Sequence, residues 1–210
     1  MEIRKLTLDY FDRIEEIYSN ARVFMRENGN PSQWKDLFPT EEMTLNDIRN
    51  GNLYGLFNGD GLECVFAYIY GHDATYDYIY DGNWLDDEPY GVVHRIASSF
   101  NTRGAGRKCL QWAIRQNGNL RIDTHENNRP MLNLLKKMGF AYCGKIHTHD
   151  GTERLAFQKK MTDRDKLINQ IHNYIPFNEQ EEKDLPVIID MLENNEDIFT
   201  RNNRVAHMTA

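Results

Sequence analysis

Residues 92–118, with the sequence VVHRIASSFNTRGAGRKCLQWAIRQNG, constrain the fold of this chain more than any other segment. They read as a buried apolar strand, a turn that carries Gly104 and Gly106, and an amphipathic helix. This order brings free backbone N–H groups and a helix N-terminus together, and such a place binds an anion. The sequence therefore predicts an α/β fold with an anion-binding turn between a strand and a helix.

The spacing of the glycines limits the kind of anion. The turn lacks the Gly-Lys-Ser/Thr ending of a nucleotide P-loop, and Cys109 stands where a dinucleotide-binding loop has its third glycine. A side chain at either glycine would keep phosphate oxygens away from the backbone. Positive charge nearby comes from Arg103, Arg107 and Lys108. A solvated helix start with ordinary flanking cations is the alternative interpretation of this turn alone.

Residues 120–146 repeat the order of strand, turn, helix and strand. Apolar residues alternate with polar ones from Leu120, and apolar residues then recur at helical spacing from Met131 to Met138. Pro130 suits the first helical turn, and Gly139 suits the residue that follows the helix. The repeated order favours a sheet with crossover helices.

The two segments together resemble the GNAT superfamily of acyl-CoA-dependent N-acetyltransferases. The pyrophosphate loop of that family has Gln or Arg, two residues, Gly, any residue, and Gly or Ala; Gly104 and Gly106 match, whereas Asn101 stands at the leading position. The next motif of the family has an Asn before a helix that ends in Gly-Phe, as do Asn128 and Gly139-Phe140 here. Further likeness to a subgroup of bacterial GNAT proteins covers residues 1–161, through QW, DGNWL, PYGVVHRIAS, RIDTHENN and GTERLAFQK.

This resemblance implies a fold and a cosubstrate. The fold would be α/β (α+β), with a mixed, mostly antiparallel sheet, a splayed central strand pair, helices on both faces and a C-terminal helical extension. The cosubstrate would be acetyl-CoA, bound in the splay without a metal. The residues implied to hold it are Ile96, Ala97, Ser98, Arg103, Gly104, Ala105, Gly106, Arg107, Lys108 and Asn128.

The family reaction is direct attack of an amine on the thioester, so a general base is needed. The candidates are His94 on the central strand and His125 or Glu126 after the next strand, although each also suits a structural or solvated role. Leu135 occupies the position where many family members have a Tyr that acts as general acid, so another group or water must protonate the thiolate. Cys109 and Cys143 read as buried structural thiols rather than acyl carriers.

Aromatic and acidic residues concentrate in the first half of the chain and could hold an ammonium group. The candidates for acceptor binding are Trp34, Tyr76, Trp84 and Tyr90. The alternative is that these rings belong to the hydrophobic core.

Elsewhere the pattern predicts a first strand ending at residues 6–8 and a helix capped by Asp9. Thr44 and Asp47 resemble the capping box of a second helix. The remaining expected strands include a hairpin and cover residues 53–57, 62–70, 76–80, 92–98, 140–146 and 153–160.

Composition excludes several classes of protein. The net charge of −7 argues against a nucleic-acid partner and favours a cationic acceptor. Without a long apolar run or an apolar leader, neither a membrane span nor secretion is expected. The 3 cysteines form no CxxC pair and suit reduced thiols in the cytoplasm. His147 and His149 lack a further ligand cluster, so no metal is expected.

Residues 162–210 differ in character from the rest. Thr162 with Asp165 and Asn178 with Glu181 can cap two helices, whose apolar residues need a partner. The segment resembles the lead-in helices and opening strand, from Val205, of certain Nudix hydrolases, but it lacks the catalytic Nudix box. One hypothesis is a fragment of an acetyltransferase–Nudix fusion. The other is a short protein whose tail docks on its own domain or on a homodimer mate.

These inferences predict an N-acetyltransferase domain at residues 1–161 that acetylates the amine of a small molecule, followed by the extension at residues 162–210. The alternative is a non-catalytic coenzyme A sensor or scaffold, which the departures at Asn101 and Leu135 motivate.

Overall fold

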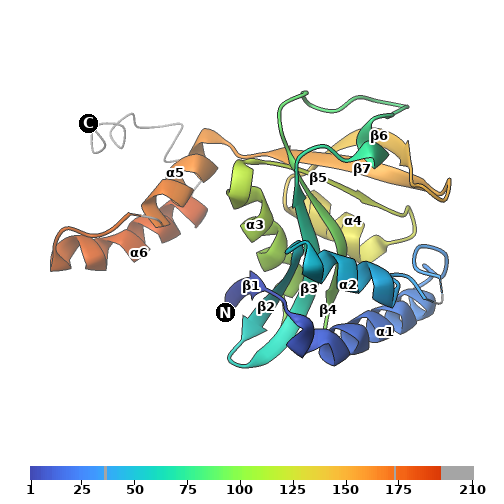
Figure 1. The fold of residues 1–210 in the computed structure, drawn as a ribbon. Coiled ribbons are helices and arrows are strands. Elements are labelled where there is room, and N and C mark those ends of the chain that lie inside the picture. Colours follow the sequence, from blue (N-terminus) through green and yellow to red (C-terminus); the bar gives the residue numbers. More distant parts are fainter. Residues whose placement is uncertain (36, 173, 195–210) are drawn as a thin grey trace. The chain divides into compact units, whose positions relative to one another are not determined.

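The computed structural model describes residues 1–35, 37–172 and 174–194 of the chain. The chain divides into two compact units, Met1–Lys160 and a second unit that begins at Met161. The first unit contains the sheet and the second contains the helices α5 and α6, as labelled in Figure 1. Among the described residues, no helix has both the length and the apolar composition to cross a membrane.

The first unit is built on one mixed sheet of 7 strands in the order β1-β2-β3-β4-β5-β7-β6. All neighbouring pairs are antiparallel except β4 and β5, which are parallel. The strands are β1 (Glu2–Lys5), β2 (Leu53–Asn58), β3 (Gly61–Tyr70), β4 (Gly91–Ser98), β5 (Asn119–Thr124), β6 (Ala141–His147) and β7 (Glu153–Lys160). The predicted fold class is confirmed.

The parallel pair separates soon after it forms. β4 and β5 are in register only at Gly91 with Leu120 and at Val92 with Arg121. On the other edge of β4 the register with β3 shifts between Val65 and Ala67, and Arg95 at this bulge has a left-handed φ of 52°. Beyond Val92, therefore, one edge of β4 carries backbone groups without a β5 partner, and the predicted splay is present.

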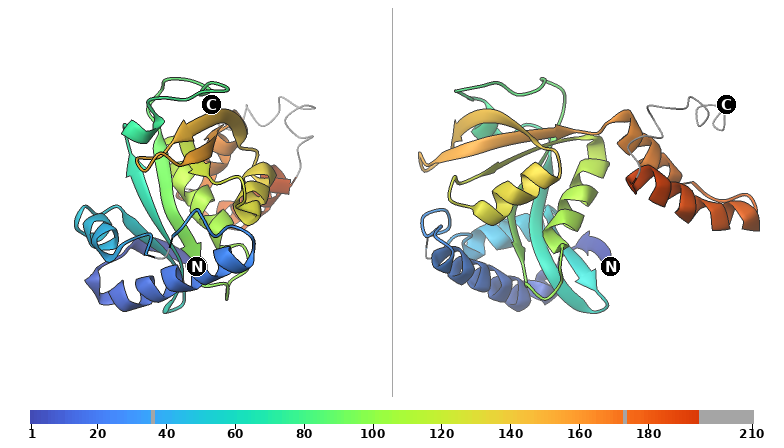
Figure 2. Two further views of the ribbon diagram at one scale, coloured as in Figure 1. Left: turned by 90° about the vertical axis from the view of Figure 1, so that its right-hand side faces the viewer. Right: turned by 180° about the vertical axis from the view of Figure 1, so that it is seen from behind.

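Side chains of β2 and β3 alternate between the two faces of the sheet and pack against a different helix on each face. Leu53, Val65 and Ala67 pack with buried residues of α1 (Phe11–Glu27). Tyr54, Phe66 and Tyr68 surround Trp112 of α3 (Ala105–Asn117), with ring centroids 4.7 to 5.7 Å from that indole. Figures 1 and 2 show α1 with α2 (Glu41–Arg49) on one face and α3 with α4 (Arg129–Lys137) on the other.

The beginnings of the first two helices differ from the prediction. β1 ends at Lys5, and a 3-10 turn, Leu8–Tyr10, precedes α1, so Asp9 does not cap that helix. α2 begins earlier than expected because the side chain of Thr40 accepts the N–H of Met43. Thr44 and Asp47 consequently lie inside α2, where both are buried.

The predicted strand at residues 76–80 was also wrong. A 3-10 turn at Ala74–Tyr76 begins there because Asp73 Oδ1 accepts the N–H of Thr75 at 2.9 Å. Tyr80 makes only an isolated bridge with Lys145. The side chain of Asp73 is thereby fixed at the base of a loop, next to β4.

The second unit contains α5 (Asp163–His172) and α6 (Glu179–Asn194). Thr162 and Asp165 form the expected reciprocal cap, with Thr162 N donating to Asp165 Oδ2 at 2.9 Å and Asp165 N donating to Thr162 Oγ1 at 3.1 Å. The N–H of Glu181 donates to Asn178 Oδ1 at 3.0 Å. The expected strand from Val205 lies outside the described residues, and the likeness to a Nudix lead-in stays a prediction.

Candidate functional site

A cleft of about 390 Å³ lies where β4, α3 and α4 meet. Every residue that the sequence predicts to hold the coenzyme lines this cleft except Lys108, which lies on the exposed surface of α3. Phe24 and Phe100 form an aromatic wall of the cleft, with ring centroids 4.6 Å apart. We call this space the coenzyme cleft.

The glycine turn has the backbone that an anion cradle requires. Gly104 is the N-cap of α3 with a left-handed φ of 79°, and no side chain caps this helix. The N–H of Ala105 makes only a long contact of 3.4 Å with Thr102 O, and the next N–H groups of α3 remain available to a ligand. A Cβ built on Gly106 would lie 3.5 Å from Leu134 Cδ2, an ordinary contact, so the fold itself tolerates a side chain there.

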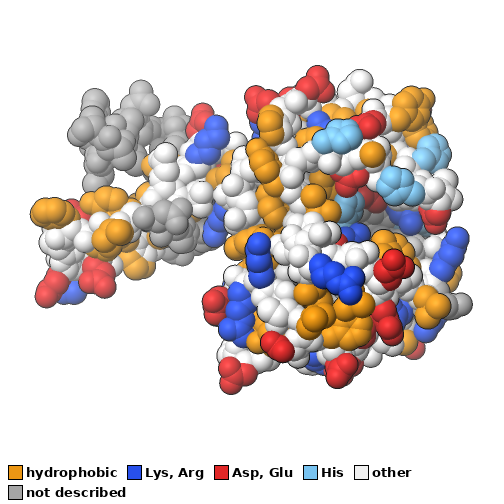
Figure 3. Space-filling view, viewed as in Figure 1, with side chains coloured by type: hydrophobic (Ala, Val, Ile, Leu, Met, Phe, Trp, Pro, Cys, Tyr) orange, Lys and Arg blue, Asp and Glu red, His pale blue; other side chains and the backbone are white. Residues whose placement is uncertain are grey.

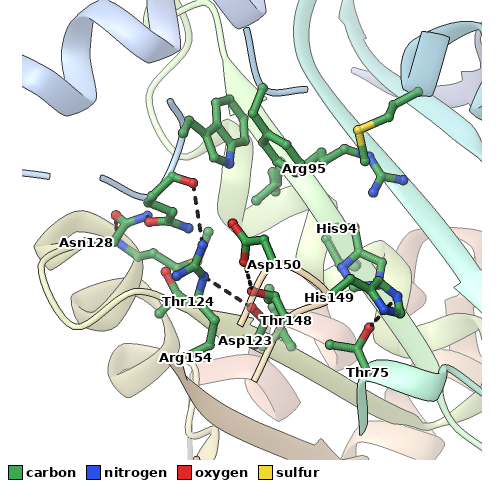
Figure 4. A pocket seen from close by; sticks show the side chains of 18 of the residues that line it. Thr75, His94, Arg95, Asp123, Thr124, Asn128, Thr148, His149, Asp150 and Arg154 are labelled. Carbon is green, nitrogen blue, oxygen red and sulfur yellow. Dashed lines mark hydrogen bonds and ion pairs between the residues drawn. The ribbon is translucent and has the colours of Figure 1, made fainter. Parts of the chain in front are cut away.

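A second cleft, of about 550 Å³, lies between the splayed strands, the α1–α2 loop and the β6–β7 turn. It shares Met25, Ile96, Asn128 and Met131 with the coenzyme cleft, so the two spaces adjoin. Figure 4 shows polar side chains from these elements around its hollow. We call it the acceptor cleft.

His94 lines the acceptor cleft in a hydrogen-bonded pair with Asp73. His94 Nε2 lies 2.7 Å from Asp73 Oδ2, and the two side chains are only 19% and 14% exposed. Burial favours a raised pKa for Asp73, but hydrogen bonds from His94 and Thr75 and the charge of the imidazole outweigh it and hold the pKa well below its usual value. Within the described residues Nδ1 of His94 has no hydrogen-bond partner, so this nitrogen is the one that can exchange a proton with a ligand.

The other two base candidates lie outside the lining of this cleft. His125 Nδ1 accepts the N–H of Asn127 at 3.2 Å, and its Nε2 lies 3.4 Å from Ser32 Oγ. Burial and the charge of Arg154 lower the pKa of His125. Glu126 is exposed. His94 is therefore the candidate that the fold places beside both a carboxylate and the cleft.

Three further residues of the acceptor cleft were missed by the sequence analysis as site residues. Arg154 of β7 and Asp123 and Thr124 of β5 form one wall. Tyr76 Oη donates to Asp123 Oδ1 at 2.8 Å. Two quoted motifs could have drawn attention to this wall, because RIDTHENN contains Asp123 and Thr124 and GTERLAFQK contains Arg154.

Arg95 also lines the acceptor cleft, and its charge is neutralised by α2. Its Nη2 and Nε lie 2.6 and 3.0 Å from Asp47 Oδ2. Both side chains are nearly buried, 13% and 11% exposed. The pair holds α2 against the strained bulge of β4.

The aromatic candidates for acceptor binding divide into two groups. Trp34 lines the acceptor cleft and packs edge-on against Tyr18, with centroids 5.7 Å apart. Tyr76 and Tyr90 belong to a core cluster against which Trp84 packs, and Trp84 Nε1 donates to Tyr76 O at 3.0 Å. These three residues lie in the core instead of the cleft lining, because their loop folds back onto β6 and β7.

Three exposed histidines contact residues of the segment 72–80. His72 Nε2 lies 2.6 Å from Asp77 Oδ1, His147 Nε2 lies 3.2 Å from Tyr80 Oη, and His149 Nε2 lies 3.4 Å from Thr75 Oγ1. Figure 3 shows histidine and acidic side chains gathered on one face. Among the described residues no group of three or more His, Cys, Asp or Glu is placed to hold a metal ion.

Two residues at or beside the position where the family resemblance predicts a general acid are apolar. Leu134 lines the coenzyme cleft, whereas Leu135, at the position of the family Tyr, is fully buried. The thiols of Cys109 and Cys143 are buried; a hydrogen bond with Cys64 and burial raise the pKa of Cys109, and burial raises that of Cys143. Neither thiol is activated for nucleophilic attack.

Comparison with solved structures identifies proteins of the same fold. A GNAT family acetyltransferase from Streptococcus agalactiae 2603 is 36% identical, with a TM-score of 0.70 over 77% of this chain and 96% of that one. A putative acetyltransferase from Staphylococcus aureus MU50 is 22% identical, with a TM-score of 0.57 over 77% of this chain and 100% of that one. A putative acetyltransferase, yncA, from Salmonella typhimurium was solved with its cofactor acetyl-CoA. It is 13% identical, with a TM-score of 0.51 over 77% of this chain and 94% of that one. Neither the protein-family models nor the curated proteins gave a match.

Proposed function

This chain belongs to the GNAT family of acetyltransferases, and we propose that its first unit transfers an acetyl group from acetyl-CoA to the amine of a small-molecule acceptor. The observation that carries the proposal is that the two clefts adjoin and share lining residues. The coenzyme cleft shares Ile96 and Asn128 with the space lined by the pair His94–Asp73. A thioester held in the first space would meet an amine held in the second.

The residues of the coenzyme cleft fit acetyl-CoA. The uncapped N-terminus of α3 and the guanidinium groups of Arg103 and Arg107 suit its phosphates, and the unpaired edge of β4 suits the amides of its pantetheine arm. A structure with the same fold was solved with acetyl-CoA, which supports this choice. When bound, acetyl-CoA supplies the activated acetyl carbonyl.

His94 is proposed as the general base. Nε2 donates its proton to Asp73, so Nδ1 carries the lone pair and can accept a proton from the acceptor ammonium or from the attacking amine. Asp73 fixes this tautomer and stabilises the imidazolium that forms. As the C–N bond forms and the C–S bond breaks, the proton on His94, or one from water, can pass to the departing sulfur, since Leu135 cannot donate one.

Release of coenzyme A thiol tests the activity. The protein is incubated with acetyl-CoA and a panel of primary amines, and free thiol is titrated. We expect His94→Gln to lower kcat by about 10²- to 10⁴-fold with unchanged affinity for coenzyme A. His125→Gln, outside the cleft lining, is the matched control and should keep its rate.

Two results would count against the proposal. If coenzyme A binds saturably but no amine releases thiol, the protein is a binding module without turnover. If His94→Gln retains the full rate while His125→Gln loses it, the base has been misassigned.

A further inference from the structure

The acceptor cleft contains a buried cation whose hydrogen bonding is incomplete. The guanidinium of Arg154 has five N–H donors and its side chain is 9% exposed. Nη1 donates to Glu153 O at 3.2 Å, and Nη2 makes a long contact of 3.5 Å with Gln33 O. The carboxylate of Asp123 stands 4.0 Å from Nε, which is beyond hydrogen-bond distance.

A second orphaned polar group lies on the same wall. Thr124 is 1% exposed and lines the acceptor cleft, and its Oγ1 has no hydrogen-bond partner among the described residues. A buried hydroxyl without a partner costs free energy, so a ligand that accepts its hydrogen bond gains affinity. Figure 4 shows Thr124 and Arg154 on the wall opposite His94.

The other charges that line the acceptor cleft already have partners or are exposed. Arg95 is paired with Asp47, and Asp73 is paired with His94. Asp150 Oδ1 accepts hydrogen bonds from Thr148 Oγ1 at 2.7 Å and from Thr152 N at 3.1 Å. Lys35 is exposed. Arg154 is thus the buried cation of the described cleft whose nearest carboxylate, Asp123 at 4.0 Å, lies beyond hydrogen-bond distance, so that it can still accept an anion.

We propose that Arg154 and Thr124 form a carboxylate subsite, and that the acceptor is an amino acid or a similar molecule carrying both an amine and a carboxylate. The guanidinium fork matches a carboxylate in two parallel hydrogen bonds, and the Thr124 hydroxyl supplies a third donor. Burial lowers the pKa of Arg154, because it disfavours the charged guanidinium more than the nearby carboxylates of Asp123 and Asp150 favour it. This inference rests on the proposed function, because the amine must still reach His94.

Binding measurements test the subsite independently of turnover. The standard amino acids and their decarboxylated amines are titrated calorimetrically into the protein saturated with coenzyme A. We expect at least one amino acid to bind about tenfold or more tightly than its decarboxylated amine, because only the amino acid has a carboxylate that can accept hydrogen bonds from Arg154 and Thr124. Arg154→Met should abolish this preference and Thr124→Val should reduce it, both with unchanged coenzyme A affinity.

Lys35→Met is the matched control, because it removes an exposed cation from the same cleft and should keep the preference. If Arg154→Met does not fold, Thr124→Val, which is nearly isosteric, decides the outcome. Equal affinity for amines and amino acids, binding of no amino acid at all, or a preference that survives in both variants would overturn the subsite. Thiol release separates the two proposals: acetylation without carboxylate preference rejects only the subsite, and carboxylate-dependent binding without thiol release rejects only the catalysis.

Discussion

Gly106→Ala should change stability and coenzyme affinity in opposite directions. Gly106 lies in the first turn of α3, and an added Cβ would make only ordinary contacts, at 3.5 Å with Leu134 Cδ2 and 4.0 Å with Ile96 Cδ1. Replacing a helical Gly by Ala stabilises a fold by about 0.5–1 kcal/mol, because the unfolded chain loses freedom. The same methyl group occupies the floor of the coenzyme cleft, so we expect coenzyme A affinity to fall by about tenfold or more, which is about 1.4 kcal/mol.

Gly104→Ala is the control for the backbone. A Cβ at Gly104 would meet nothing within 4 Å, but the residue has a φ of 79°, so the variant should lose about 1–2 kcal/mol of stability. Urea denaturation gives both stability changes, and titration calorimetry gives both affinities. Wild-type affinity in Gly106→Ala would refute the cradle, and equal destabilisation of the two variants would refute the assignment of backbone conformations.

Three further predictions follow from buried groups. Because Asp73 has a pKa below its usual value, it stabilises the fold above a pH of about 4, and this contribution is lost as the pH falls further. Urea denaturation between acid and neutral pH should show that the free energy of unfolding falls less steeply towards acid pH in Asp73→Asn than in the wild type. Equal slopes in the two proteins would contradict the pairing with His94. Asp47→Asn leaves Arg95 buried without a charge partner and should cost about 3–5 kcal/mol, and a loss below 1 kcal/mol, measured in the same way, would exclude the pair as a support of the bulge. The buried cysteine thiols should react with a thiol reagent only slowly before unfolding, and rapid reaction of the native protein would contradict their burial.

The parts of the fold that depend on neighbouring residues could be predicted from the sequence. The strand, turn and helix around Gly104, and the helix that begins beside Pro130, have local signals because glycine, proline and apolar spacing act within a few residues. The beginning of α2 was misplaced because Thr44 has an acidic residue, Asp47, at capping-box distance, whereas the true cap, Thr40, has Met43 at that distance. The splayed strands came from family resemblance, since no local pattern encodes where two strands part.

The acceptor cleft was largely unpredictable for a related reason. His94 meets Asp73 across 21 positions, and Arg95 meets Asp47 across 48. Arg154 approaches Gln33 across 121 positions. The spacing of these residues in the sequence does not predict such contacts, because the order of the strands in the sheet and the paths of the loops bring the partners together. Tyr76 and Tyr90 could not be assigned to core or cleft from their side-chain type, which suits both places.

The local charges of the acceptor cleft refine what the net charge suggests about the acceptor. A net charge of −7 favours a cation approaching from solution, but this long-range field does not determine which groups a bound ligand contacts. Inside the cleft, Asp73 is engaged by His94, whereas the buried guanidinium of Arg154 lacks a hydrogen-bonded carboxylate. An acceptor with both an amine and a carboxylate suits both the net charge of the protein and the groups inside the cleft. Its amine is attracted by the overall negative field and can reach His94, and its carboxylate completes the hydrogen bonding of Arg154. A simple amine would leave that cation and the Thr124 hydroxyl unsatisfied, and the resulting loss of affinity is the basis on which the protein would discriminate between the two.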